Sequence, residues 1–390
     1  DGDSLVESIK NDINTSNKEA LIIFDSFDSV REDRLRSLWL SIIEEVINSL
    51  PSVKVLVSVR TYDAEKSPQL KKLFSINPFE KRPSNVFDVK GYSDEELTQA
   101  FDQLPNLKSL YDEAMPEMQI LLRNPYYFWL LECLSDGLKD ASQKISSIRS
   151  AQQLLNQFWE MKMNDLTNNS RPSTELFLET MIREQIKRKV LVSSRSDINA
   201  EIENNSFTDL CSNNLISTVG SETRFKFSHN ILFDFAVSKL VLVGSETAVE
   251  RFIEEDKSLQ LFLRPSFLFY FQELFWKEDN HETFWNLFFK VSTGEESQAT
   301  HLIYIILPTT LVQEAFSLKD FDILFEKLAT RQGEKVVSLI LQALGIHSIL
   351  KNATSEHIDF WAEFLVKLSE NIQYKFAWNL AKINGELLEL

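Results

Sequence analysis

The chain has 390 residues, 43% hydrophobic and 25% charged, which is typical of a protein that folds around an apolar core. A formal net charge of −17 argues against non-specific binding to nucleic acid or to an anionic membrane surface. No run reaches the ~18 consecutive apolar residues that a membrane span needs. The two cysteines, Cys133 and Cys211, lie far apart, so we expect neither a disulfide framework nor a zinc site, and a reducing, cytoplasmic location.

Two apolar runs near the N-terminus predict a pair of buried strands. The first, residues 20–24, ends at Asp25, and the second, residues 53–59, ends at Arg60. The apolar stripe of residues 31–50 predicts a helix between them. A unit of this kind joins parallel strands by a right-handed crossover, so Asp25 and Arg60 are expected at the same edge of one sheet.

That edge is where open α/β sheets bind their ligands. Asp28 follows Asp25, and two carboxylates suit Mg²⁺ on a nucleoside triphosphate, with Arg60 on the phosphate. The alternatives are that Asp25 only caps the turn after a core strand and that Arg60 forms a structural ion pair with Asp28 or Asp63. The residues alone leave both interpretations open.

Helical patterns dominate the middle of the chain after a short strand expected at 85–89. Ser93 and Glu96 form a capping-box pattern that predicts the start of a helix just after Gly91. Asn124 followed by Pro125 predicts the start of another, strongly apolar helix.

Further helical patterns precede a β-hairpin expected at 215–228, with its turn around Gly220. Helices followed by a hairpin are the order of a winged helix. His229 closes the second strand and precedes the apolar helix at 230–243, and a hydrogen-bonded core histidine is the alternative to a functional one.

From residue 245 to the end, the patterns are helical, without a fixed repeat motif. They predict an irregular α-solenoid or a helical bundle. Its many aromatic residues are interpreted as core rather than as the lining of a ligand site.

In this order, the motifs resemble the STAND class of P-loop NTPases, close to the NACHT-type modules of bacterial defence and signalling proteins. LIIFDSFDS at 21–29 is similar to the Walker B strand, and VSVR at 57–60 is similar to the strand of the sensor-1 arginine. Gly91–Glu96 resembles the segment that opens the helical lid, and Pro125 resembles the lid proline. His229, in FSH at 227–229, resembles the winged-helix histidine. The likeness covers about residues 1–243.

Pattern and resemblance together predict a mainly α fold with a partial α/β, parallel-sheet N-terminal domain. The expected domains are a partial P-loop NTPase domain at 1–90, a helical lid at 91–170, a winged helix at 171–243 and a C-terminal α-helical, solenoid-like domain at 244–390.

The resemblance also implies a role for each matching residue in the intact parent protein. Asp25 would hold Mg²⁺ through water, Asp28 would polarise the attacking water, and Arg60 would sense the γ-phosphate. Pro125 would pack on adenine, and His229 would touch the β-phosphate of ADP in the resting state.

Two departures from the family pattern are visible. No glycine of the chain is followed by lysine, so the phosphate-binding loop G-x-x-x-x-G-K-[ST] is absent, and Ser29 stands where the family has a catalytic glutamate. We expect a chain truncated between the P-loop and the Walker B strand, with natural loss of nucleotide binding as the alternative. ATP or ADP, with Mg²⁺, would then bind the intact parent protein. This chain alone is expected to bind none of them.

Three functions follow. The first is an ATP/ADP-controlled switch whose C-terminal helices sense a protein ligand and which forms a homo-oligomer on activation. The second is a nucleotide-independent scaffold that only recruits partners. The third, a winged-helix DNA-binding regulator, is disfavoured because nine basic and nine acidic residues cancel within 171–240.

Overall fold

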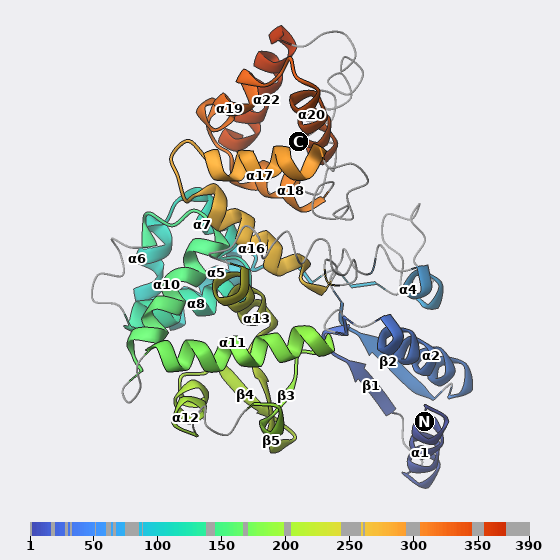
Figure 1. Cartoon of the computed structure of the whole chain (residues 1–390). Helices are drawn as coiled ribbons and strands as arrows, with labels where there is room; N and C mark the ends of the chain where they lie inside the picture. The colour runs from blue at the N-terminus through green and yellow to red at the C-terminus, as the bar shows by residue number, and fades with distance from the viewer. Residues whose placement is uncertain are drawn as a thin grey trace. The chain divides into compact units, whose positions relative to one another are not determined.

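The computed structural model of the chain is shown in Figure 1. It describes residues 2–16, 20–27, 30–31, 33–50, 52–59, 64, 68–74, 86–87, 89–137, 145–166, 171–198, 204–242, 259, 262–293, 305–344 and 355–371. Most of these residues are helical, as expected. The chain divides into two compact units: Asp1–Lys90 with Gln185–Leu191, and Gly91–Glu184 with Val192–Leu390. No described helix has the length and apolar character needed to cross a membrane.

The first unit is built on a small parallel sheet. Its elements are α1 (Gly2–Ser16), β1 (Ala20–Phe24), α2 (Asp33–Ser49), β2 (Val53–Val57) and α4 (Pro68–Leu73). β1 and β2 pair in parallel, from Ala20 opposite Val53 to Phe24 opposite Val57. The predicted strand–helix–strand unit is therefore confirmed.

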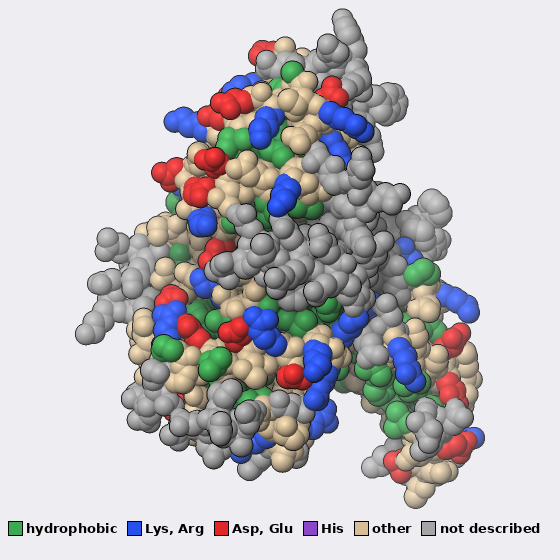
Figure 2. Space-filling view, viewed as in Figure 1, with side chains coloured by type: hydrophobic (Ala, Val, Ile, Leu, Met, Phe, Trp, Pro, Cys, Tyr) green, Lys and Arg blue, Asp and Glu red, His purple; other side chains and the backbone are tan. Residues whose placement is uncertain are grey.

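Among the described residues, one face of this sheet is covered and the other is exposed. Ile42, Ile43 and Val46 of α2 are buried in the two apolar clusters that α1, α2, α4 and the strands share. On the opposite face Leu21, Ile23 and Leu56 are 59%, 57% and 47% exposed. Figure 2 shows hydrophobic side chains at the surface in this region.

The expectation that both strands are buried is therefore wrong for one face. An unbroken apolar run predicts cover on both sides of a parallel strand, but among the described residues only one side is covered. The strand expected at 85–89 is also not formed by its described residues: Val86, Phe87 and Val89 are exposed and have no strand paired with them.

The second unit begins with helices. They are α5 (Asp94–Gln103), α6 (Pro105–Glu113), α7 (Pro116–Leu121), α8 (Pro125–Gly137) and α10 (Ala151–Asn164). The capping box predicted at Ser93 and Glu96 opens α5. Pro105, Pro116 and Pro125 each stand at the first position of a helix, where the missing N–H costs nothing because no helical partner is available for it.

A three-stranded antiparallel sheet follows α11 (Arg171–Arg188), whose last residues belong to the first unit. The strands β3 (Ser193–Ser194), β4 (Ile216–Val219) and β5 (Ser221–Phe227) lie in the order β3-β5-β4, and α12 (Asn204–Ser212) precedes the hairpin. Gly220, with φ of 68°, makes the turn between β4 and β5. The hairpin leads into α13 (Asn230–Val237) and a π-helical turn (Ser238–Leu242).

The remaining described elements are helices. They are α16 (Arg264–Phe275), α17 (Glu282–Thr293), α18 (Leu307–Glu314), η5 (Leu318–Phe321), α19 (Asp322–Glu326), α20 (Arg331–Leu344) and α22 (Ser355–Asn371). Their aromatic residues are mostly core, as predicted: Trp285, Phe321, Trp361 and Phe364 contact one another in a buried chain of rings. The irregular α-solenoid or helical bundle expected here stays a prediction.

Candidate functional site

The predicted metal ligand, Asp25, lies directly after β1 and is tied to the end of β2. The Ser58 hydroxyl donates to Asp25 Oδ1 at 2.6 Å and accepts a hydrogen bond from the Ser26 amide at 2.6 Å. The Phe27 amide also donates to the Ser58 carbonyl at 2.8 Å. These bonds fix an exposed carboxylate at the edge of the sheet where the strands end.

The exposed carboxylate of Asp25 is suited to be one ligand of a magnesium ion. Among the described residues, the second oxygen of Asp25, Oδ2, has no hydrogen-bond partner, and Mg²⁺ is commonly held by one or two carboxylates together with substrate phosphates and water. The turn-cap interpretation of Asp25 fits equally well, because the Ser58 and Ser26 bonds close the turn after β1.

The two residues predicted to be catalytic, Asp28 and Arg60, lie outside the described residues, as do Ser29 and Asp63. The strands that precede them, β1 and β2, pair in parallel. Their roles, and the alternative ion pairs, therefore stay predictions.

The predicted adenine-contacting residue, Pro125, stands exposed at the start of α8 in the second unit. Asn124 caps this helix, because its side-chain oxygen accepts from the Tyr126 amide at 3.0 Å. The preceding residue, Arg123, binds the segment that opens α5: its carbonyl accepts from the Tyr92 amide at 2.7 Å, and its guanidinium donates to the Tyr92 carbonyl at 3.0 Å.

The same guanidinium pairs with Asp94 at 2.5 Å, and this bond is the largest cause of the raised pKa of Arg123. Gly91 lies so close that a Cβ atom there would be 2.8 Å from the Arg123 carbonyl oxygen. Two of the motifs of the family resemblance, Gly91–Glu96 and Arg123–Pro125, are thus in direct contact.

His229, the predicted phosphate contact, is half-buried at the N-terminus of α13. Its Nδ1 accepts from the Ile231 amide at 3.2 Å, so in the neutral ring the proton is on Nε2. The imidazole stacks on Tyr126, with ring centroids 3.9 Å apart and an interplanar angle of 17°. His229 therefore contacts the residue next to Pro125, and the starts of α8 and α13 meet.

Tyr126 is the residue of this site that the sequence analysis missed. Its hydroxyl is buried and has no hydrogen-bond partner among the described residues, and burial raises its pKa. The only signal in the sequence was its position directly after the Asn-Pro helix start, which gives no hint of a contact with a histidine far along the chain.

The comparisons with known proteins leave these likenesses without outside support. No protein family matches this chain, and neither does any curated protein. Within the described ranges, no group of three or more His, Cys, Asp or Glu side chains is placed to hold a metal ion. Two groups of residues remain as the basis for a function: Asp25 with Ser58 at the end of the parallel strands, and His229 with Tyr126 at the starts of α13 and α8.

Proposed function

We propose that the chain is part of a STAND-type nucleotide switch of the NACHT kind. The contact between His229 and Tyr126, beside Pro125, carries this proposal. In such a switch, the lid contacts adenine and the histidine of the winged helix contacts the β-phosphate of the same ADP molecule, so the lid and the winged helix lie near each other in the resting state. The sheet of β3, β4 and β5 with α11 and α12 supports the assignment of a winged helix.

The residues of this junction suit a diphosphate. The N-terminus of a helix favours an anion, because its first amides lack helical partners and the helix dipole is positive there. α8 and α13 both begin here. Pro125 has no N–H, and the amides of Tyr126 and Ile231 already donate to Asn124 and His229, so the two helix dipoles and the ring N–H of His229 at Nε2 are the groups that would attract the anion. In the first unit, Asp25 would contribute a carboxylate to the Mg²⁺ ion that accompanies ATP.

The loop that holds the phosphates is not in this sequence and, on this proposal, comes from a segment outside it. Exchange of ADP for ATP would release His229 and expose a surface for self-association, in the cytoplasm. The C-terminal helices would bind the protein ligand that triggers the exchange.

The experiment is a titration of a fluorescent ADP analogue into the chain, prepared with the residues that precede it in its gene. His229→Ala should weaken ADP binding at least tenfold, since it removes a charge-assisted contact with phosphate. His229→Asn keeps a side-chain oxygen that can cap α13, so it separates loss of the cap from loss of the ring.

Thr218→Ala, an exposed change on β4 of the same hairpin, is the matched control and should bind ADP as the wild type does. If the extended chain binds no ADP, or if His229→Asn binds it as tightly as the wild type, the switch proposal fails.

A nucleotide-independent scaffold is the second candidate, favoured by Ser29 and by the missing phosphate loop. It predicts that Asp25→Ala leaves partner recruitment unchanged in cells. A switch predicts that the same change abolishes ATP-dependent activation, so one variant distinguishes the two functions.

A further inference from the structure

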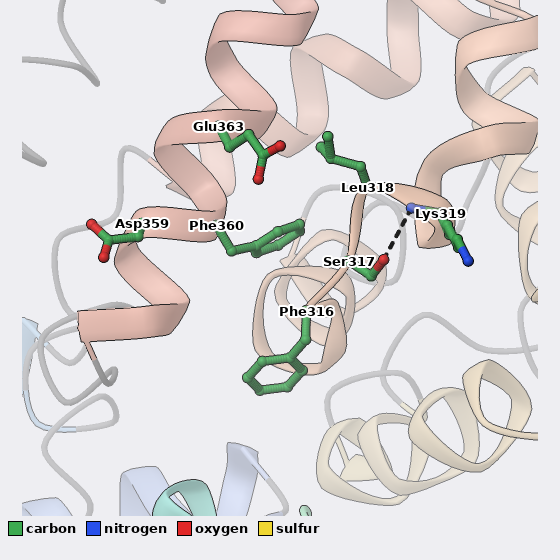
Figure 3. Close-up of a pocket in the computed structure, with 7 residues that line it drawn as sticks. All are labelled: Phe316, Ser317, Leu318, Lys319, Asp359, Phe360 and Glu363. Carbon is green, nitrogen blue, oxygen red and sulfur yellow. Dashed lines mark hydrogen bonds between the residues drawn. The ribbon is translucent and has the colours of Figure 1, made fainter.

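The C-terminal helices carry a hollow of about 590 Å³, drawn in Figure 3. It lies between the segment that leads into α19 and one face of α22. The first wall is residues 316–319, and the second is Asp359, Phe360 and Glu363 of α22. None of the residues that the nucleotide proposal uses belongs to it.

The first wall is held in place by its own hydrogen bonds. Ser317 accepts from the Lys319 amide at 3.2 Å, the bond dashed in Figure 3. Asp320 accepts from the amides of Phe316 and Ser317 at 2.9 Å, which completes a capping box. These bonds hold the backbone on both sides of Leu318 in one conformation.

Aromatic rings form the floor. Phe316 stacks on the buried His357, with centroids 4.4 Å apart and planes at 23°, and Phe360 lies nearly parallel to His357 at 6.2 Å. Burial lowers the pKa of His357, which keeps its ring neutral. The faces of such rings attract cations.

Neighbouring rings in the same helical region already carry cations. Lys367 lies 4.4 Å from the centroid of Phe325, and Lys327 lies 4.4 Å from that of Phe289. In the described parts of the chain, no lysine or arginine lies over Phe316 or Phe360.

Two carboxylates complete the hollow. Asp359 and Glu363 lie one turn apart on α22, are exposed, and have no hydrogen bond or ion pair with any other described residue. In Figure 3, the Glu363 carboxylate faces the same space as Leu318 and the ring of Phe360. The ammonium group of Lys319 points away from it, so the cavity side of α22 is negative.

We propose that this hollow binds an arginine side chain of a partner protein. The aliphatic part of the arginine would lie along Leu318 and the accessible part of Phe360, and its guanidinium would pair with Glu363. A planar guanidinium suits a ring next to a carboxylate better than a compact ammonium does, because it stacks and donates two parallel hydrogen bonds. This proposal does not depend on nucleotide binding.

The test titrates three capped tripeptides, Gly-Arg-Gly, Gly-Lys-Gly and Gly-Glu-Gly, into the isotope-labelled chain and follows backbone amide NMR signals. A single side chain should bind with a dissociation constant on the order of millimolar. The arginine peptide should shift the amides of residues 317–319 and 363 most, the lysine peptide less, and the glutamate peptide not at all.

Glu363→Gln should weaken the arginine peptide about fivefold, as expected for loss of one exposed, well-oriented ion pair, and Asp359→Asn about twofold. Glu370→Gln, which changes an exposed acid of the same helix outside the hollow, is the matched control and should have no effect. Because the changed side chains are exposed and isosteric, all three variants should fold.

Equal shifts from the arginine and glutamate peptides would overturn the proposal. So would equal affinities for the arginine peptide in the Glu363→Gln and Glu370→Gln variants, or shifts that lie outside residues 316–319 and 359–363.

Discussion

The carboxyl group of Glu314, at the end of α18, offers the sharpest test of the helical region. It is 4% exposed, and its two oxygens accept from Gln272 Nε2 at 2.6 Å and from Trp276 Nε1 at 2.8 Å. Neither donor is charged, so little offsets the cost of burying an anion, and burial raises the pKa of Glu314 to about 7.

This shift makes stability depend on pH in a defined direction. The unfolded chain has a glutamate pKa near 4.5, so between pH 4.5 and 7 the folded state binds more protons than the unfolded state. The contribution of Glu314 to stability is therefore lost as the pH rises through this range. At 1.36 kcal/mol per pH unit, the loss amounts to about 3 kcal/mol by pH 8.

Glu314→Gln removes the titration. Gln272 Oε1 is buried and has no hydrogen-bond partner among the described residues, so rotating the Gln272 amide would let this oxygen accept from the NH₂ group that the substitution introduces. Trp276 would keep its acceptor. Apart from the lost titration, the substitution should change the free energy of unfolding by an amount that does not depend on pH.

The assay is thermal denaturation of both proteins at intervals from pH 4.5 to 8. The difference in Tm between variant and wild type should grow by about 5 °C in favour of the variant. Glu326→Gln, an exposed carboxyl on α19, should show a difference that does not change with pH. A Tm difference that stays constant for Glu314→Gln as well would refute the reasoning, because it would mean that the carboxyl titrates alike in the folded and unfolded states.

Substitutions at three further positions probe other features. Ser93→Ala removes the side-chain cap of α5 and should destabilise that helix by about 1 kcal/mol, seen as faster amide hydrogen exchange in its first turn; exchange that stays unchanged would contradict the capping role. Gly220→Ala places a side chain at φ of 68°, where nothing lies within 4 Å of the new Cβ. Backbone strain alone should therefore lower the free energy of unfolding by about 1 kcal/mol, as measured by chemical denaturation. Gly220→Asn should lower it by less. Because burial lowers the pKa of His357, the contribution of this side chain to stability should fall as the pH drops below about 6.5. The difference in stability between His357→Gln and the wild type should therefore shift in favour of the variant over this range, and a difference that stays constant would argue against a neutral buried ring.

Local chemistry made part of the fold predictable. The two β-branched runs, with an amphipathic helix between them, specify a parallel pair, and Gly220 specifies the hairpin turn, because each feature is set by neighbours along the chain. The capping box at Ser93 and the helix start at Pro125 were predictable for the same reason.

Long-range contacts were not predictable in this way. The stacking of His229 on Tyr126 and the burial of Glu314 between Gln272 and Trp276 join residues far apart in sequence. No periodicity encodes them. The uncovered face of β1 escaped prediction for a related reason: an apolar run shows which side chains can be buried, but not whether anything covers them.

The sheet face that the described residues leave exposed affects every binding measurement proposed above. Aliphatic side chains left in water adsorb dyes, plastic surfaces and peptides without regard to sequence, and a fluorescent nucleotide analogue is itself partly hydrophobic. A protein carrying Leu21→Ser and Leu56→Ser would keep the covered face intact while making the bare one polar. A binding signal that disappears in this double variant should be assigned to non-specific adsorption, not to specific binding of a nucleotide or of the arginine peptide.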